Sequence, residues 1–212
     1  MSTYTLDANA AKQADSINSR IEHSGKYAGS FTRAEPTVSI KGTRGVDLSF
    51  KADSGESADY LTLWTHNKEG KPLMGYNTLM AIMMCLRVKS LSEEDGVIEK
   101  YVKASGKREK VNTPLFKDLM NKPLSLLIQM EESEYEGKAS WKPVIFGVCD
   151  KDNFTASEIM NKATKAETAD KMLFVLKDKP MKPGSISVPN NSHPEAGQSF
   201  RNDDAFDENI PF

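Results

Sequence analysis

The sequence predicts a mainly β fold: a five-stranded, partly open barrel with a helix between the third and fourth strands, then a C-terminal helix and a disordered acidic tail. Three observations predict this fold. Five segments alternate apolar and polar residues, one segment carries apolar residues at helical spacing, and the composition after Leu176 shifts to Pro, Gly, Ser and Asn. We therefore expect a domain at residues 1–176, a flexible linker at 177–202 and an acidic segment at 203–212.

The first two strands are predicted from a period of two. Apolar residues alternate with small polar ones from Tyr27, and the alternation resumes after Pro36 at Val38 and Ile40, which indicates a strand with a break or bulge. After a Gly-rich turn, a second strand has Val46, Leu48 and Phe50 on one face and Asp47, Ser49 and Lys51 on the other.

The third strand, Asp59–His66, is the most informative. Leu61, Leu63 and Thr65 would face the core, and the opposite face would carry Tyr60, Thr62, Trp64 and His66. Such a face can stack unpaired bases, each worth roughly 1–3 kcal/mol. Two alternatives stay open: Trp64 packs under a loop, or the register slips by one residue and the faces exchange.

A helix is predicted next. Leu79, Ile82, Met83 and Leu86 follow helical spacing, with Asn77 or Thr78 as its cap. Residues 89–122 are a polar excursion with a local excess of basic residues, which suggests a mobile basic arm. Thr113-Pro114 would then begin a short helical turn.

The remaining elements complete the domain. Leu124–Met130 alternates as a fourth strand, Glu131–Lys138 is a polar connection, and Ser140–Asp150 supplies a fifth strand. The pattern Thr155-x-x-Glu158 is typical of a capping box and predicts a helix from Glu158 to Leu176. Three strands, a helix and two strands is the element order of an OB-fold.

Composition and motifs exclude several classes of protein. Cys85 and Cys149 are the only cysteines and form no Cys-x-x-Cys pair, so neither a disulfide framework nor a zinc site is expected. No signal segment is visible and the longest apolar run, Leu79–Leu86, is too short for a membrane span, so we expect a cytoplasmic protein. Phosphate-loop, metalloprotease and hydrolase motifs are absent, so we expect no enzyme, no cofactor and no metal.

The last ten residues combine four acids with an apolar end. Asp203, Asp204, Asp207 and Glu208 are followed by Ile210-Pro211-Phe212, and this segment holds no basic residue. Pro211 favours an extended backbone, so the Phe212 ring and its carboxylate would be presented together to a partner. Because 28 basic residues stand against 30 acidic ones, the rest of the chain carries a small basic excess. An ordinary solvated acidic terminus is the alternative.

The hexapeptide Asp207-Glu208-Asn209-Ile210-Pro211-Phe212 is similar to the Asp-Asp-Asp-Ile-Pro-Phe tip of bacterial single-stranded DNA-binding proteins, and departs from it at Glu208 and Asn209. The overall layout looks most like phage-encoded members of that family. The resemblance implies an OB-fold core that coats and protects single-stranded DNA without sequence specificity. It also implies a tip that recruits DNA replication, recombination or repair proteins in the cytoplasm, that of the bacterial host for a phage protein.

The residues expected to carry these functions form two sets. Phosphate contacts and base stacking in a basic groove are expected from Lys41, Arg44, Lys51, Tyr60, Trp64, Lys68 and Lys71, with Lys107, Arg108 and Lys110 as a flexible clamp. Partner binding is expected from Asp203, Asp204, Asp207, Glu208, Ile210, Pro211 and Phe212. A homo-oligomer is conceivable. A protein-binding adaptor and a strand-annealing accessory protein stay open as alternatives, as does RNA in place of DNA.

Overall fold

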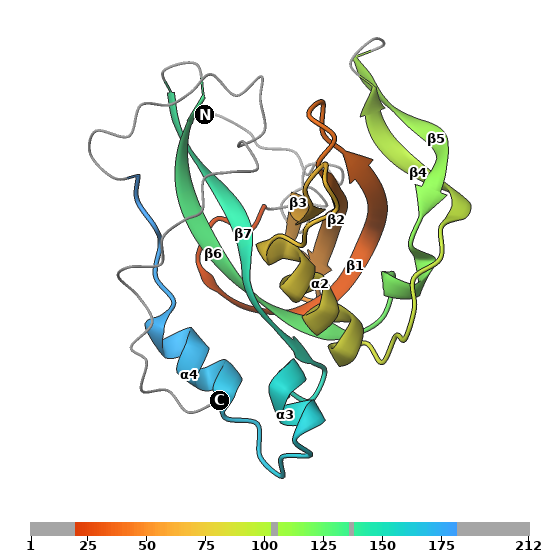
Figure 1. The fold of residues 1–212 in the computed structure, drawn as a ribbon. Coiled ribbons are helices and arrows are strands. Elements are labelled where there is room, and N and C mark those ends of the chain that lie inside the picture. Colours follow the sequence, from red (N-terminus) through yellow and green to blue (C-terminus); the bar gives the residue numbers. More distant parts are fainter. Residues whose placement is uncertain (1–19, 103–105, 136–137, 182–212) are drawn as a thin grey trace, which may run out of the picture.

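The structure of the protein is a computed structural model, which describes residues 20–102, 106–135 and 138–181 (Figure 1). The segment expected to bind a partner, 203–212, lies outside the described residues, as does most of the expected linker. Among the described residues, no helix is both long and apolar enough to cross a membrane.

The fold is mainly β and is built on a five-stranded antiparallel sheet in the order β3-β2-β1-β6-β7. Its strands are β1 (Gly25–Val38), β2 (Arg44–Ala52), β3 (Ser57–His66), β6 (Leu124–Tyr135) and β7 (Lys138–Asp150). β3 and β7 form the two edges, and within the described residues no ladder joins them, so the sheet does not close into a barrel. The five predicted strands are therefore confirmed, and closure of the sheet is not observed.

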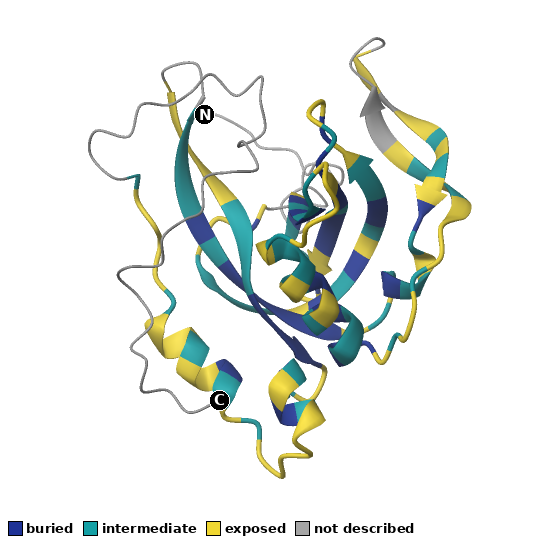
Figure 2. Ribbon diagram, viewed as in Figure 1, coloured by how far each residue is buried: buried dark blue, intermediate teal, exposed yellow. Residues whose placement is uncertain are grey.

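The larger core cluster lies against one face of this sheet, and a smaller buried cluster of Leu127, Cys149 and Ala169 is separate from it. α2 (Met74–Cys85) packs against β3 and β7 and buries Leu79, Ile82 and Cys85. Figure 2 shows buried residues along β1, β2 and β6 and mostly exposed residues on α4 (Thr168–Val175). The largest fully buried side chains of the sheet are Phe31, Leu48, Phe50, Leu124, Leu126, Leu127, Ile128 and Cys149.

The helix begins earlier than its sequence predicts. Asn77 and Thr78 lie inside α2 and do not cap it, because the preceding turn is hydrogen-bonded back to the end of β3. The Leu73 amide donates to the Thr65 carbonyl over 2.8 Å, and the Lys71 amide donates to Asn67 Oδ1 over 2.8 Å. The chain is thereby placed to enter the helix at Met74.

The segment expected to be a mobile basic arm folds as a β-hairpin. β4 (Glu94–Val102) and β5 (Lys107–Leu115) pair antiparallel over their length. The prediction that Pro114 starts a helical turn is wrong, because Pro114 lies in β5, and the turn η1 (Lys117–Leu119) follows it. The base of the hairpin is tied to β1, since the Phe116 amide donates to the Ala34 carbonyl over 2.8 Å.

The predicted C-terminal helix is interrupted. It is replaced by α3 (Ala156–Met160) and α4 (Thr168–Val175), and the Glu158 carboxylate accepts hydrogen bonds from the amides of Thr155, Glu167 and Thr168, each 2.8 Å long. The predicted capping box is thus present. The break follows because one carboxylate holds the starts of both helices.

Two predicted connections are strand-like. Residues 131–135, expected in a polar loop, continue β6, and Lys138 begins β7. Residues 177–181, expected at the start of the linker, lie along β6. The Lys179 amide donates to the Met130 carbonyl over 2.8 Å, and the Glu132 amide donates to the Lys179 carbonyl over 2.9 Å. The chain is therefore held to the sheet as far as Met181.

Candidate functional site

The polar face of β1, β2 and β3 lies opposite the core. In β3, Leu61, Leu63 and Thr65 are buried, and Tyr60 is 65% exposed on the other face. The predicted register is therefore confirmed, with Thr62, Trp64 and His66 half-buried on the same face as Tyr60.

Two β-bulges add Arg33 to this face and project Tyr60 from it. The pairing of β1 with β2 shifts between Phe31 and Arg33, so the buried positions Phe31 and Ala34 stand three residues apart. The pairing of β2 with β3 shifts between Leu48 and Phe50, which places Asp59 and Tyr60 between buried Ala58 and Leu61. An extra residue in a strand re-aims the side chains beside it.

Arg33 is the centre of a polar network on this face. Its Nη2 lies 2.7 Å from Asp47 Oδ2, its Nη1 lies 3.5 Å from Glu35 Oε2, and its Nε donates to Ser49 Oγ over 3.1 Å. The carboxylates are themselves held, since Thr62 Oγ1 donates to Asp47 Oδ1 over 2.9 Å and Thr113 Oγ1 donates to Glu35 Oε1 over 2.7 Å. The Arg33 side chain is only 11% exposed.

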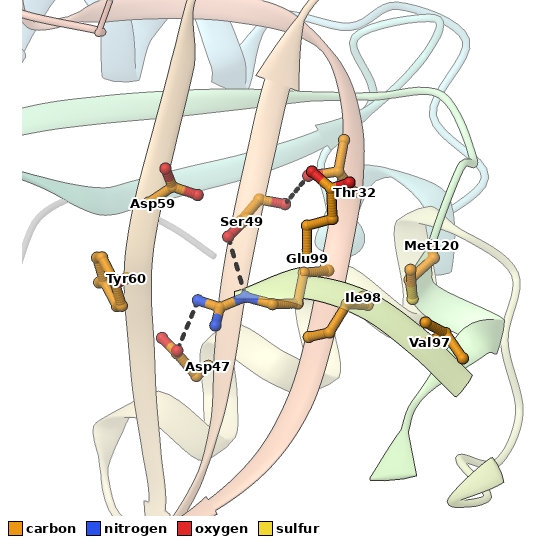
Figure 3. A pocket seen from close by; sticks show the side chains of 10 residues that line it. Thr32, Asp47, Ser49, Asp59, Tyr60, Val97, Ile98, Glu99 and Met120 are labelled. Atoms are coloured by element: carbon orange, nitrogen blue, oxygen red, sulfur yellow. Dashed lines mark hydrogen bonds and ion pairs between the residues drawn. The ribbon is translucent and has the colours of Figure 1, made fainter. Parts of the chain in front are cut away.

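An open groove of about 580 Å³ lies between this face and the β4–β5 hairpin. Figure 3 shows Tyr60 on one side of it, Val97 and Ile98 on the other, and Asp47 and Ser49 between them. The described lining is Thr32, Arg33, Asp47, Ser49, Asp59, Tyr60, Val97, Ile98, Glu99 and Met120.

The lining of the groove is acidic, whereas a basic groove was expected. Three carboxylates stand against one guanidinium among the described lining residues, and that guanidinium is paired with Asp47. The side-chain carboxylates of Asp59 and Glu99 have no hydrogen-bond or ion-pair partner in the part of the chain that the structure describes. Of the expected DNA-binding residues, Tyr60 alone is part of this described lining.

Four of the expected phosphate contacts gather instead at one end of the sheet. Lys41 follows β1, Arg44 begins β2, Lys68 and Lys71 follow β3, and all four are exposed. The two loops adjoin, because Gly42 lies beside Lys68 and Gly70 lies beside Arg44. A Cβ atom built on Gly42 would be 3.3 Å from Lys68 Cβ, and one built on Gly70 would be 3.9 Å from Arg44 Nη2. We call Lys41, Arg44, Lys68 and Lys71 the loop cations.

Trp64 lies on β3 next to this end. It pairs across the strands with Gly45, and a Cβ added at Gly45 would lie 3.0 Å from Trp64 Cε3. The missing side chain therefore leaves room for the indole ring, which is half-buried. Nearby, the His66 and Tyr76 rings meet edge to face with centroids 5.1 Å apart. The indole ring therefore packs on the sheet at Gly45, whereas packing under a loop was the alternative.

The other expected residues are spread out. Lys51 is exposed at the opposite end of β2, beside Ser57. Lys107 and Lys110 are exposed on β5, on which Arg108 also lies, though the structure does not describe the Arg108 side chain. The partner-binding set, Asp203 to Phe212, is outside the described residues.

Sequence reasoning missed Arg33, Asp47 and Ser49. A signal was available in the sequence at both bulges. Thr32-Arg33 and Asp59-Tyr60 each place two residues, instead of one, between buried apolar positions, and so interrupt the period of two. No group of three His, Cys, Asp or Glu side chains among the described residues could hold a metal ion. Neither the scan against protein-family models nor the search of curated proteins gives a match to this chain.

Proposed function

We propose that this chain binds single-stranded DNA without strong sequence preference during DNA replication, recombination or repair, and recruits partner enzymes through residues 203–212. The observation that carries the proposal is the position of the loop cations beside an aromatic sheet face. Cations at a rim and aromatic rings on a sheet are what a sequence-tolerant single-strand binder requires.

The order of the strands supports the same proposal. If the five strands of the sheet are renumbered 1 to 5 along the chain, they lie side by side in the order 3-2-1-4-5. In the sequence, α2 lies between the third strand, β3, and the fourth, β6. We take this as the order of an OB-fold barrel opened between its third and fifth strands. OB-folds commonly bind oligonucleotides on the face of strands two and three and on the loop between strands one and two. Tyr60, Trp64 and Lys41 occupy those places.

The sequence of the last ten residues supports the second half of the proposal. Four acids followed by Ile210-Pro211-Phe212 resemble the tip that bacterial single-stranded DNA-binding proteins use to bind partners. An extended apolar segment beside acidic side chains fits a hydrophobic pocket with a basic rim.

The test compares two double charge reversals. The variant K68E/K71E removes two loop cations, and K162E/K165E reverses two exposed lysines between α3 and α4, at the bottom of Figure 1. Fluorescence anisotropy of a labelled single strand is followed over a range of salt, with duplex as competitor. We expect K68E/K71E to weaken binding and to reduce the slope of log affinity against log salt by about 1.4, since each phosphate contact on a single strand contributes about 0.7.

The control K162E/K165E should keep the affinity and the slope of the parent chain. Equal effects of the two variants would remove the loop cations from the proposed interface. Absence of binding at every salt concentration would leave the protein-binding adaptor as the better candidate.

A further inference from the structure

We infer that Arg33 is a positioning residue that holds Tyr60 as one wall of a pocket for a single nucleobase, and that phosphate groups stay outside this groove. The inference rests on the proposed function and concerns how a strand would lie on the protein. It assigns the groove between the β1–β3 face and the β4–β5 hairpin to bases, and the loop cations to the backbone.

The first step is the rigidity of Arg33. Its guanidinium meets Asp47, Glu35 and Ser49 at 2.7, 3.5 and 3.1 Å, and the side chain is 11% exposed. A planar group with three anchored nitrogens has a fixed orientation. Its Cζ lies 5.3 Å from the centre of the Tyr60 ring, within the range of a cation–π contact.

The second step is the position of Tyr60. The residue sits at the bulge of β3 with φ of 60°, a backbone conformation that favours glycine or asparagine over tyrosine. The side chain is 65% exposed. An aromatic ring that far exposed would have several rotamers open to it, and the contact with Arg33 selects one of them. The ring therefore offers a pre-ordered stacking surface.

The third step is the opposite wall. Val97 and Ile98 of β4 and Met120 after η1 line the groove across from Tyr60 (Figure 3). At about 580 Å³ the open groove has room for a heterocyclic base. An aromatic surface facing aliphatic side chains suits a flat, uncharged heterocycle.

The fourth step is charge. Asp47, Asp59 and Glu99 line the groove, and the single guanidinium among the described lining residues is already paired. A phosphate entering here would meet uncompensated carboxylates at close range, which is unfavourable. A neutral base carries no such penalty, so a bound strand would turn its bases into the groove and its phosphates toward the loop cations.

The test uses the full chain and two labelled oligonucleotides of equal length and charge, one of ordinary deoxynucleotides and one of abasic sites. The measured quantity is the ratio of their affinities. Tyr60→Asn removes the ring and suits the backbone conformation at this position, and Tyr60→Phe keeps the ring as a control. Arg33→Lys keeps the positive charge but loses the planar group. Thermal melting of each variant establishes that it is folded.

We expect the parent and Y60F to prefer the base-bearing strand. We expect Y60N to lose roughly 5- to 150-fold of that preference, while its affinity for the abasic strand stays the same. R33K should lose part of the same preference. The double variant R33K/Y60N should match Y60N alone, because Arg33 acts through Tyr60.

Two results would overturn the inference. An unchanged ratio in Y60N would show that the groove takes no base, and an unchanged ratio in R33K, with Y60N reduced, would show that Arg33 has no positioning role. In both cases binding of the oligonucleotides would persist and the proposed function would stand. Failure of the parent chain to bind either strand would instead refute the proposed function.

Discussion

At the scale of single residues, Glu158 holds together the segment that follows the sheet. Burial by itself would raise the pKa of its carboxyl, but hydrogen bonds from the backbone of Thr155, Thr168 and Glu167 outweigh burial and lower it to about 2. The residue is 9% exposed, so its partners are screened only weakly by water. The ionised form is therefore bound more tightly in the folded chain than in the unfolded one.

Replacing Glu158 by Gln should destabilise the protein by about 1–3 kcal/mol at neutral pH, because the neutral amide accepts these bonds more weakly and leaves amides unpaired. The stabilisation from Glu158 is complete above its ordinary pKa of about 4.3 and is lost as pH falls through that value toward 2. Urea unfolding at pH 7 and pH 3 measures both effects. The difference between E158Q and the parent should shrink at pH 3.

The control for this prediction is Glu167→Gln, which removes an exposed carboxylate that pairs with Lys171 across 3.5 Å. Such a surface pair contributes little, so E167Q should stay within about 0.5 kcal/mol of the parent. A loss in E158Q that stays constant from pH 7 to pH 3 would mean that the carboxylate charge is not its cause.

The two thiols should be unreactive in the folded protein. Burial raises the pKa of Cys85 to about 12 and that of Cys149 to about 11, and the Asp150 carboxylate adds to both shifts. Because the thiolate is the nucleophile, labelling by a disulfide reagent at pH 8 should be slow in the native protein, and both thiols should react at once in denaturant. Rapid native labelling of either thiol would indicate local opening of the sheet.

The faces of the strands could be predicted residue by residue, but the two bulges could not. The period of two places Leu61, Leu63 and Thr65 in the core correctly because one face of the sheet is buried. At Thr32-Arg33 and Asp59-Tyr60 the period breaks, and a single sequence does not tell whether such a break ends the strand or bulges it. The candidate groove depends on both breaks, so its Arg33 was missed.

At the scale of elements, the sequence predicts well where local signals and long-range contacts agree. Five strands and α2 were found because their apolar residues meet one core. The β4–β5 hairpin was missed because four of the nine residues in each of its strands are charged and its base is fixed by distant bonds to Ala34 and Glu35. The interruption of the C-terminal helix was missed for a similar reason. Besides capping α3, the Glu158 carboxylate accepts hydrogen bonds from the amides of Glu167 and Thr168, which lie nine and ten residues further along the chain.

The segment 177–181 should contribute to the stability of the domain. Besides its two backbone bonds to β6, the Gln129 side chain donates to the Lys177 carbonyl over 2.8 Å. A chain that ends at Met181 should melt as the full-length protein does. One that ends at Leu176 should lose roughly 1–3 kcal/mol, after the entropy of ordering the segment offsets part of the gain. Differential scanning calorimetry measures both.

The variant Lys179→Met distinguishes the contribution of the backbone hydrogen bonds from that of the Lys179 side chain. Lys179 Nζ lies 2.9 Å from Glu131 Oε1 at an exposed site, so its removal should cost less than about 1 kcal/mol. Full stability of the chain that ends at Leu176 would show that the segment only follows the edge of β6 without supporting it.

At the scale of the whole molecule, charge of opposite sign is separated. The loop cations lie at one end of the β1–β3 face, carboxylates line the neighbouring groove, and four acids stand in residues 203–212. The net charge of −2 hides this separation. A polyanionic strand and the acidic segment would therefore be attracted to the same cations, and each would weaken the binding of the other.

Removing residues 203–212 should strengthen binding to single-stranded DNA, because four carboxylates no longer compete for the loop cations. We expect the affinity for the strand to rise roughly 2- to 10-fold at low salt, which corresponds to a competing interaction of about 0.5–1.4 kcal/mol between exposed charges. At high salt these charges are screened, and the affinity should rise little. Anisotropy titrations at both salt concentrations measure the effect. The amide variant D203N/D204N/D207N/E208Q keeps the length of the chain and should show the same gain, whereas Phe212→Ala keeps every side-chain charge and should show none. If F212A raised the affinity as much as the deletion does, the apolar end would be the segment that competes with DNA. The acidic residues would then act only on the rate at which a partner associates.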